Sequence, residues 1–245
     1  MALNGKVALV TGARQGLGKA IALGMANAGA DLLIADRVLE DGKLAEVAKE
    51  IEALGRRVSI SGGDISVEAD VEAMVKKGTS ELGKIDILIN NAGVTAPDRF
   101  ADMPLKRWNL IINVNLTGTA YCAHAVLPQM IERNSGIIIN MSSILALRIQ
   151  MSVAYGATKA AVERFTIGLA REMRKSNISV TAMRPFFAKT EVVSGFMEGR
   201  TDMSDWEEPE MWGVYCAKIA EAEPTVTSGK IFDQTLCKET FGPWR

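Results

Sequence analysis

Tyr155 and Lys159 are the residues whose types and spacing point most directly to chemistry. They begin and end the run Tyr155-Gly156-Ala157-Thr158-Lys159. Residues four apart on a helix share a face, so this spacing would place an ammonium beside a phenol. A free phenol, with a pKa of about 10, is a poor base at neutral pH, but a nearby cation stabilises the phenolate. We therefore expect the pair to exchange a proton with a bound molecule, although the same spacing also arises by chance in many helices.

A glycine-rich turn near the start of the chain is typical of nucleotide binding. Its residues, Thr11-Gly12-Ala13-Arg14-Gln15-Gly16-Leu17-Gly18, join a strand-like run to a helical pattern. Glycines there let the backbone approach a diphosphate held at the helix N-terminus. A tight turn without a ligand is the alternative. The expected cofactor contacts in this turn are Gly12, Arg14, Gln15, Gly16, Leu17 and Gly18.

Asp36 agrees with the nucleotide interpretation because it ends the second strand-like run. An acid at that distance bonds the ribose hydroxyls of an adenosine. The same charge repels a 2'-phosphate, so we expect NAD to be favoured over NADP. Arg14 and Arg37 oppose this preference, since either guanidinium is placed to reach a 2'-phosphate.

Two further turns follow later strand-like runs. Asp64-Ile65 comes after the third, where a carboxylate would bond the adenine amino group or, equally, cap a helix. Asn90-Asn91-Ala92-Gly93 comes after the fourth. We expect its Asn91, Ala92 and Gly93 to join the strand ends and to pass the backbone close to the cofactor.

Short β-branched runs alternate with longer helical patterns along the whole chain. The expected strands are Val7–Thr11, Leu32–Asp36, Val58–Ser61, Ile85–Asn90, Ile137–Met141, Ile178–Met183 and Lys230–Asp233. The expected helices are Leu17–Asn27, Asp41–Leu54, Glu68–Glu81, Leu105–Gln129, Val153–Arg174 and one near Glu208–Glu221. Nearly continuous apolar strands suit a parallel sheet covered on both faces. The order predicts one α/β domain, 1–245, with a doubly wound sheet.

Composition excludes several classes of protein. The 245 residues carry 28 basic and 29 acidic side chains, a net charge of -1, and no Lys/Arg block that would track a phosphate backbone. We therefore expect no nucleic-acid partner. We see no cleavable signal and no apolar stretch near the ~20 residues that span a bilayer, so we expect a cytoplasmic protein without a membrane partner.

The cysteines and the single histidine offer no metal site. Cys122, Cys216 and Cys237 are odd in number and far apart, which favours buried thiols over disulfides or metal ligands. His124 stands alone after a helical run, where packing or an interface explains it better than zinc binding or a nucleophilic triad.

Residues 186–209 break the regular pattern. The segment is rich in Gly, Met, aromatic and acidic residues with weak periodicity. We expect it to cover a ligand site, and a surface insertion without function is the alternative.

Taken together, these motifs resemble the short-chain dehydrogenase/reductase family. TGARQGLG, Asp36, DI at 64–65, NNAG, an Asn in NVNLTG, SS after GIIINM, YGATK and RP at 184–185 occur in that family's order and near its spacing, from Gly5 to about Asp233. The resemblance implies a single three-layer Rossmann domain with a parallel seven-stranded sheet. It also implies a homotetramer or homodimer, packed through helices near Leu105–Gln129 and Val153–Arg174.

The resemblance assigns roles to four residues. Tyr155 would exchange the proton with the substrate oxygen, and Lys159 would lower the pKa of Tyr155 and bond the nicotinamide ribose. Asn115 would hold a water in a proton relay from Lys159. The family's serine, which hydrogen-bonds the substrate oxygen, falls on one of two neighbours. Counting from Gly136 or Asn115 gives Ser143, counting back from Tyr155 gives Ser142, and we choose Ser143 because strand pairing fixes its register.

The chain departs from the family pattern after Pro185, where Phe186 and Phe187 replace a usual glycine. This change would narrow the pocket or alter how Ala188 and Thr190 meet the cofactor. Leu145 also stands where the family often has glycine. The expected apolar pocket wall comprises Leu145, Ile149, Gln150, Val153, Phe186, Phe187, Val192, Phe196, Met197 and Trp206.

The leading hypothesis is an NAD-dependent oxidoreductase that transfers a hydride between nicotinamide and a secondary alcohol or ketone. One alternative is an NADPH-dependent reductase of 3-oxoacyl thioesters, which Asp36 disfavours. The other is a nucleotide-binding scaffold that retains little catalysis.

Overall fold

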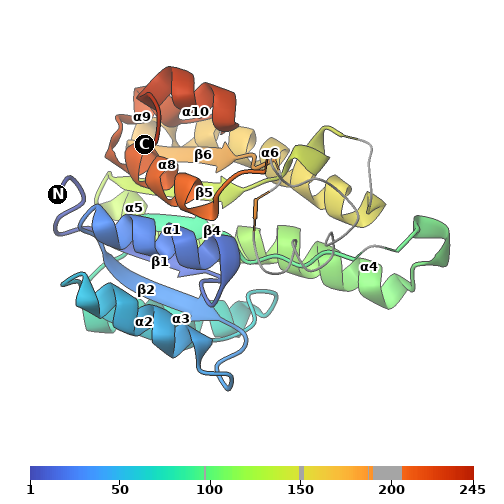
Figure 1. Ribbon diagram of the computed structural model, residues 1–245, viewed down its shortest axis with the longest axis horizontal. Helices are drawn as coiled ribbons and strands as arrows, with labels where there is room; N and C mark the ends of the chain where they lie inside the picture. The colour runs from blue at the N-terminus through green and yellow to red at the C-terminus, as the bar shows by residue number, and fades with distance from the viewer. Residues whose placement is uncertain (97, 149–151, 187, 190–205) are drawn as a thin grey trace.

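The computed structural model describes residues 1–96, 98–148, 152–186, 188–189 and 206–245 (Figure 1). Within these residues one parallel sheet of seven strands has the order β3-β2-β1-β4-β5-β6-β7. The strands are β1 (Val7–Thr11), β2 (Asp31–Asp36), β3 (Val58–Gly62), β4 (Ile87–Asn90), β5 (Gly136–Met141), β6 (Ile178–Met183) and β7 (Ile231–Phe232). All seven expected strands are therefore present, with ends shifted by at most two residues.

Helices cover both faces of the sheet, so the expected three-layer, doubly wound architecture is confirmed. On one face lie α1 (Gly16–Asn27), α2 (Lys43–Ala53) and α8 (Pro209–Glu221), whose apolar side chains share a core with the strands. On the other face lie α3 (Glu68–Leu82), α5 (Thr119–Glu132) and α6 (Val153–Met173). Every residue of β1, β4 and β6 is buried, which explains why these runs are almost entirely apolar.

The segment expected as one helix, Leu105–Gln129, is a composite. It begins with α4 (Leu105–Ile112), continues as a π-helical stretch (Asn113–Gly118) and ends with α5. In Figure 1 α4 projects beyond the strand ends, where it packs against α6. A π-helical turn is a rare interruption that is frequent at functional sites, and this one places Asn115 beside the carboxyl ends of the strands.

This same segment is the one to weigh against the expectation that no apolar stretch is long enough to span a bilayer. By length and composition alone, the continuous 28-residue helix Leu105–Glu132 would reach across a membrane. In this fold its inner face packs on β4, β5, α3 and α6, as a core helix does.

Short elements complete the fold. Single turns of 3-10 helix lie at Phe100–Asp102, Ile144–Ala146 and Arg174–Ser176. Two helices near the C-terminus, α9 (Pro224–Thr227) and α10 (Gln234–Phe241), were not expected from the sequence. α10 begins where Asp233 accepts a hydrogen bond from Leu236 N, an N-cap that predicts a helix start. The buried thiols of Cys122, Cys216 and Cys237 agree with their expected packing role.

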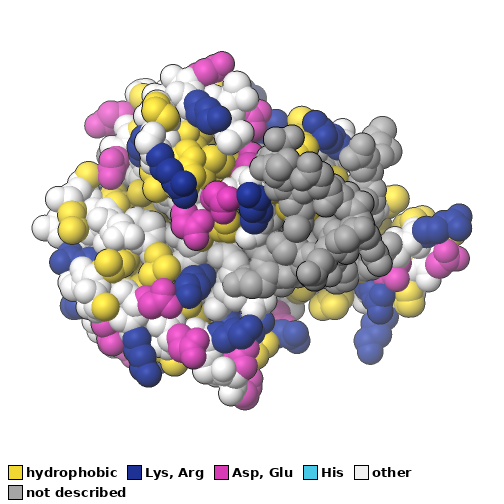
Figure 2. Space-filling model, viewed as in Figure 1, with side chains coloured by type: hydrophobic (Ala, Val, Ile, Leu, Met, Phe, Trp, Pro, Cys, Tyr) yellow, Lys and Arg dark blue, Asp and Glu magenta, His cyan; other side chains and the backbone are white. Residues whose placement is uncertain are grey.

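The visible surface carries mixed charge. In Figure 2, Lys and Arg side chains lie next to Asp and Glu side chains over the described part of the face shown. That arrangement fits the net charge of -1.

Candidate active site

Parallel strands bring the motifs together at the carboxyl edge of the sheet. The strand order reverses between β1 and β4, and crevices at such switch points are where open α/β sheets bind ligands. Thr11 Oγ1 accepts hydrogen bonds from the backbone N–H groups of Asn91 and Ala92, both at 3.1 Å. Asn91 Nδ2 donates in return to the carbonyl oxygens of Thr11 and Gly12, at 3.0 and 3.2 Å. These bonds fix the two turns of the crevice against each other.

The glycine turn requires its glycines. Gly12 has a φ of +67°, and a Cβ there would lie 2.8 Å from Cα of Ala92. A Cβ on Gly18 would lie 2.0 Å from the carbonyl oxygen of Gly12. Gln15 precedes α1 without capping it through its side chain, so the first N–H groups of the helix face the turn uncapped. This cradle fits the diphosphate of a dinucleotide.

Asp36 closes the β2 side of the crevice. Its Oδ1 accepts a hydrogen bond from Val38 N at 3.0 Å and lies 3.5 Å from Nε of Arg14. Arg37 is exposed. The carboxylate is thus placed at the strand end where a ribose would bind, with the guanidinium of Arg14 next to it.

One carboxylate oxygen of Asp64 hydrogen-bonds a residue two positions further along the chain. Its Oδ1 accepts from both the N–H and the hydroxyl of Ser66, at 2.9 and 2.7 Å. These contacts belong to the turn that leads into α3; the N-cap of that helix is Val67, without a side-chain cap, so the capping alternative for Asp64 is wrong. Ile65 is buried, and a Cβ at Gly118 would meet its side chain at 2.8 Å. The π-helical stretch thereby packs tightly against this turn.

Tyr155 and Lys159 project from the first turns of α6. Burial raises the pKa of Tyr155 to about 12, while the neighbouring Ser143 side chain acts in the opposite direction. Burial lowers the pKa of Lys159 to about 8. Lys159 Nζ lies 5.4 Å from the Tyr155 ring centroid and donates to the carbonyl oxygen of Met141 at 2.7 Å. Burial is the largest influence on the pKa of the Tyr155 phenol, so the lowering of that pKa by Lys159 stays a prediction.

The side chain of Asn115 makes three hydrogen bonds. Its side chain bridges both backbone groups of Val94, accepting from the N–H at 2.8 Å and donating to the carbonyl oxygen at 2.9 Å. It also donates to Thr158 Oγ1 at 3.1 Å. A Cβ built on Gly93 would lie 3.3 Å from Asn115 Oδ1 and 3.7 Å from Lys159 Nζ. Asn115, Gly93 and Lys159 therefore form one wall of the site.

The two neighbouring serines point to different partners. Ser143 contacts the Tyr155 phenol, and its Oγ accepts from Leu145 N at 3.3 Å. Ser142 donates to Glu163 Oε1 at 2.6 Å. Glu163 in turn receives two hydrogen bonds of 2.8 Å from Arg184. The structure thus places Ser143 with the catalytic candidates and Ser142 in a buried ion-pair network behind them.

Glu207 is a buried carboxylate that the sequence did not single out. Its Oε2 accepts from Phe186 N and from Trp212 Nε1, both at 3.0 Å. Burial raises its pKa. The sequence indicated only that residues 186–209 contain several acids. Because the periodicity of this segment is weak, it did not predict which of them is buried. Glu207 anchors the backbone just after Pro185, where the family usually has glycine.

Comparison with known proteins gives the family. A family model described as short chain dehydrogenase matches residues 6–201. The chain belongs to the short-chain dehydrogenase family. An uncharacterized oxidoreductase of Staphylococcus saprophyticus is 38% identical over 190 residues, which cover 77% of this chain and 80% of that protein. Another, from Staphylococcus aureus strain USA300, is 36% identical over 195 residues, covering 79% and 83%.

Solved structures agree. A short-chain type dehydrogenase/reductase from Mycobacterium marinum superposes with a TM-score of 0.85 at 30% identity, covering 94% of each chain. The protein is therefore an oxidoreductase of the short-chain dehydrogenase family, an enzyme class that acts on CH–OH or carbonyl groups and usually binds a nicotinamide cofactor. Among the described residues, no group of three His, Cys, Asp or Glu side chains is placed to hold a metal ion.

The expected pocket wall is described only in part. Of its members, Ile149, Gln150, Phe187, Val192, Phe196 and Met197 lie outside the described residues, as does the expected cofactor contact Thr190. Trp206 is buried, Leu145 and Phe186 are partly buried, and Val153 is 58% exposed. The ring of Phe186 lies 4.6 Å beneath the guanidinium of Arg148. Pro185 is buried and its carbonyl oxygen accepts from Ile144 N at 2.8 Å, while Ala188 pairs with Glu207. In this short-chain dehydrogenase, then, Phe186 is held by both its ring and its backbone.

Proposed function

We propose that this enzyme transfers a hydride between NAD and a secondary alcohol or ketone, with Tyr155 as the group that exchanges the proton. The observation that carries the proposal is the contact of Ser143 with the Tyr155 phenol. Tyr155 in turn lies four residues before Lys159, which is buried. Two hydroxyls that meet at one point can both hydrogen-bond a single substrate oxygen. The nicotinamide, when bound, supplies the carbon that accepts or donates the hydride.

The residues then divide the remaining work. Ser143 holds the substrate oxygen and stabilises the negative charge that develops on it. Tyr155 takes the proton of the alcohol, or returns it to the ketone oxygen. Lys159 would hold the nicotinamide ribose and favour the ionised phenol. Asn115 fixes the turn after β4 through Val94 and would order a water beside Lys159.

Cofactor contacts are proposed on both sides of the crevice. The turn from Gly12 to Gly18 would take the diphosphate, Asp36 the adenosine ribose, and Asp64 with Ile65 the adenine. Asn91, Ala92 and Gly93 would line the floor, and Pro185, Ala188 and Thr190 would meet the nicotinamide amide. The carboxylate of Asp36 at the end of β2 favours NAD over NADP.

The substrate body would be apolar, because Leu145, Phe186 and Trp206 contribute little polar surface. A homodimer or homotetramer in the cytoplasm completes the proposal, and residues 186–209 would cover the substrate.

The test is the absorbance of reduced nicotinamide with the wild-type enzyme, a panel of secondary alcohols with NAD or NADP, and ketones with each reduced cofactor. Tyr155→Phe should lower kcat by about 10³-fold, within the range for general acid–base catalysis, and keep NAD affinity. Tyr121→Phe, at a half-buried position of α5 beside α3, is the matched control and should keep full turnover. Turnover in Tyr155→Phe equal to wild type would refute the mechanism. No turnover of the panel despite NAD binding would favour a nucleotide-binding scaffold.

The neighbouring serines give a second, internal comparison. Ser143→Ala should cost about 10²-fold in kcat because it removes the donor to the substrate oxygen. Ser142→Ala removes the donor to Glu163 and the longer contact, 3.4 Å, to the backbone carbonyl oxygen of Lys159, and it should affect stability more than kcat. Equal losses of kcat in the two variants would contradict the assignment of Ser143.

A further inference from the structure

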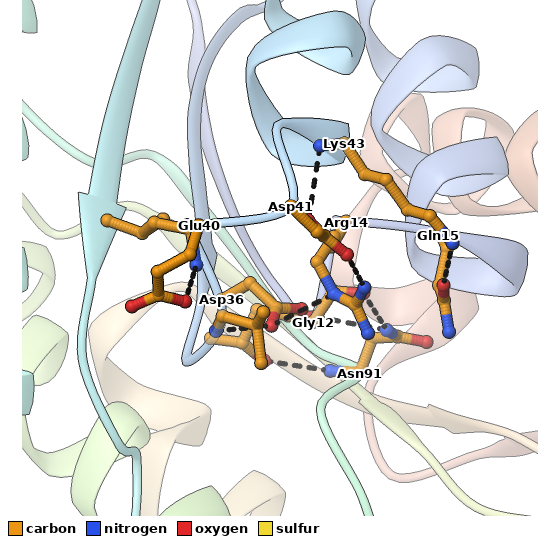
Figure 3. A network of polar contacts seen from close by, with 11 residues as sticks. Gly12, Arg14, Gln15, Asp36, Glu40, Asp41, Lys43 and Asn91 are labelled. Carbon is orange, nitrogen blue, oxygen red and sulfur yellow. Dashed lines mark hydrogen bonds and ion pairs between the residues drawn. The ribbon is translucent and has the colours of Figure 1, made fainter.

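The arginine of the glycine turn is held between two carboxylates of the next strand-to-helix connection (Figure 3). Arg14 Nη1 donates to Oδ2 of Asp41, and Arg14 Nε lies 3.5 Å from Oδ1 of Asp36. Arg14 and Asp36 are largely shielded from solvent, with side chains 19% and 17% exposed. The three groups together carry a net charge of -1. The direct hydrogen bond of Arg14 is therefore to Asp41 and not to Asp36.

Asp41 is itself fixed in place. Its Oδ1 accepts from Lys43 N at 3.2 Å, in the turn that starts α2. Lys43 Nζ then donates to Gln15 Oε1 at 3.1 Å. Figure 3 shows that two side-chain bridges, Arg14 to Asp41 and Lys43 to Gln15, tie the β2–α2 connection to the glycine turn. A carboxylate anchored in this way keeps the guanidinium oriented without the cost of ordering it on each binding event.

The pairing bears directly on what the site accepts. A 2'-phosphate on an adenosine ribose bound at Asp36 would need a free guanidinium beside it. Of the two candidate arginines, Arg14 lies against the Asp36 carboxylate, whereas Arg37 is exposed. Arg14 Nε is buried and, within the described residues, has no hydrogen-bond acceptor. This Nε is shielded beside Asp36, and the Nη1 donor of the same side chain is already used by Asp41.

We propose that Asp41 is a coenzyme-specificity residue. By pairing with Arg14 it withholds the guanidinium from a 2'-phosphate, so that Asp36 and the paired arginine together select a dinucleotide with a free 2'-hydroxyl. The inference rests on the proposed function in one respect only, that a nicotinamide dinucleotide binds in this crevice.

Asp41→Asn is the decisive variant, because the amide keeps the acceptor for Lys43 N and removes the charge that holds Arg14. Equilibrium titration of NAD and NADP by calorimetry should show NADP binding about tenfold tighter than in wild type, as expected for one charge-assisted hydrogen bond gained. NAD affinity should change less than about threefold. Asp41→Ser serves as a second variant, and thermal unfolding checks that each protein is folded.

Two further proteins separate the ion pair from a general charge effect. Glu40→Gln removes an equal charge from the same connection, where its carboxylate accepts only from Leu39 N at 3.2 Å among the described contacts. It should leave the ratio of NADP to NAD affinity unchanged. In Asp41→Asn combined with Arg14→Ala, the gain for NADP should disappear. The affinities for the fragments adenosine 2',5'-bisphosphate and 5'-AMP should change among the variants in the same way as those for NADP and NAD.

The contrary results separate a failure of the Asp41 proposal from a failure of the proposed function. An unchanged affinity ratio in Asp41→Asn, an equal gain in Glu40→Gln, or a gain that survives Arg14→Ala would overturn the role of Asp41 while leaving the proposed oxidoreductase intact. If wild type bound neither dinucleotide, the proposed function would fall first, and the specificity role with it.

Discussion

At the scale of the residue, Glu207 shows how much one buried carboxylate organises. It is 7% exposed, and a single oxygen accepts from both Phe186 N and Trp212 Nε1. Burial is the largest cause of its raised pKa, which hydrogen bonds from those donors and the charge of Lys238 oppose and the charge of Asp233 reinforces. Glu207 thus holds the backbone next to the proposed nicotinamide site while paying an electrostatic penalty.

Replacing Glu207 separates these two effects. The folded pKa lies above the unfolded one, so the folded state binds more protons between them, and stability falls as pH rises through that interval. Glu207→Gln keeps an acceptor for both donors and removes the penalty, so the variant should gain stability relative to wild type as the pH increases from 4 to 7. Glu207→Ala should lose about 2 kcal/mol by leaving two donors unpaired. Urea unfolding at several pH values measures the stability of both variants. If the stability difference between Glu207→Gln and wild type did not depend on pH, the raised pKa of Glu207 would be contradicted.

Lys159 should impose the opposite trend at alkaline pH. Its folded pKa of about 8 lies below its ordinary value of 10.5. Between these values the unfolded chain binds a proton that the folded chain does not, so stability should rise with pH, by up to about 3 kcal/mol. Lys159→Met should lack this rise. Denaturant unfolding from pH 7.5 to 9.5, below the range where Tyr155 titrates, would show it as a difference between the two curves; parallel curves would refute it.

At the scale of the element, the crossing of α1 and α8 depends on two glycines. A Cβ on Gly24 would lie 2.5 Å from the carbonyl carbon of Gly213, and a Cβ on Gly213 would lie 2.4 Å from the carbonyl oxygen of Ala20. Both clashes are with backbone, which cannot rotate away. The crossing holds α1, whose N-terminus carries the glycine turn, in its place on the sheet.

Gly213→Ala should therefore destabilise the protein by about 2 kcal/mol, because the helices must separate. Gly168→Ala in α6 is the control: its Cβ would meet only the end of the Arg164 side chain, at 3.4 Å. There the better helix propensity of alanine should raise stability by about 0.5–1 kcal/mol. The unfolding midpoints of the two variants, in heat and in urea, should shift in opposite directions. An unchanged stability of Gly213→Ala would show that the two helices do not cross tightly.

At the scale of the whole molecule, four of the exposed apolar side chains lie on α4 and α6, the helices through which we propose that the protein assembles. Leu105 and Leu110 on α4 are 72% and 47% exposed, and Val153 and Ile167 on α6 are 58% and 46% exposed. Such side chains on packed neighbouring helices favour burial against a second copy. Light scattering should give two or four times the 26.4 kDa of one chain.

Ile167→Arg should shift the protein towards a smaller species, because a charge would replace an apolar contact in the interface. Leu54→Arg, at the end of α2 and 37% exposed, is the control and should keep the wild-type mass. A wild-type protein that elutes as a monomer would refute the proposed assembly.

The sequence by itself determined the features that depend on short-range pattern. Apolar runs and helical periodicity located the strands and most helices, and motif spacing located the glycine turn, Asp36, Tyr155 and Lys159. These signals are local, because a strand covered on both faces must be apolar throughout and a helix repeats every ~3.6 residues. α10 was missed because its eight residues give a weak pattern.

Only the tertiary structure decided the partners of polar side chains. Ser143 and Ser142 are adjacent, yet the backbone turns one toward Tyr155 and the other toward Glu163. Arg14 meets Asp41 across 27 positions of sequence, and Glu207 meets Phe186 across 21. Such pairs form only when sheet order and helix crossings bring distant turns to the same edge. Their geometry, rather than residue type, determines which charge is free to bind a ligand.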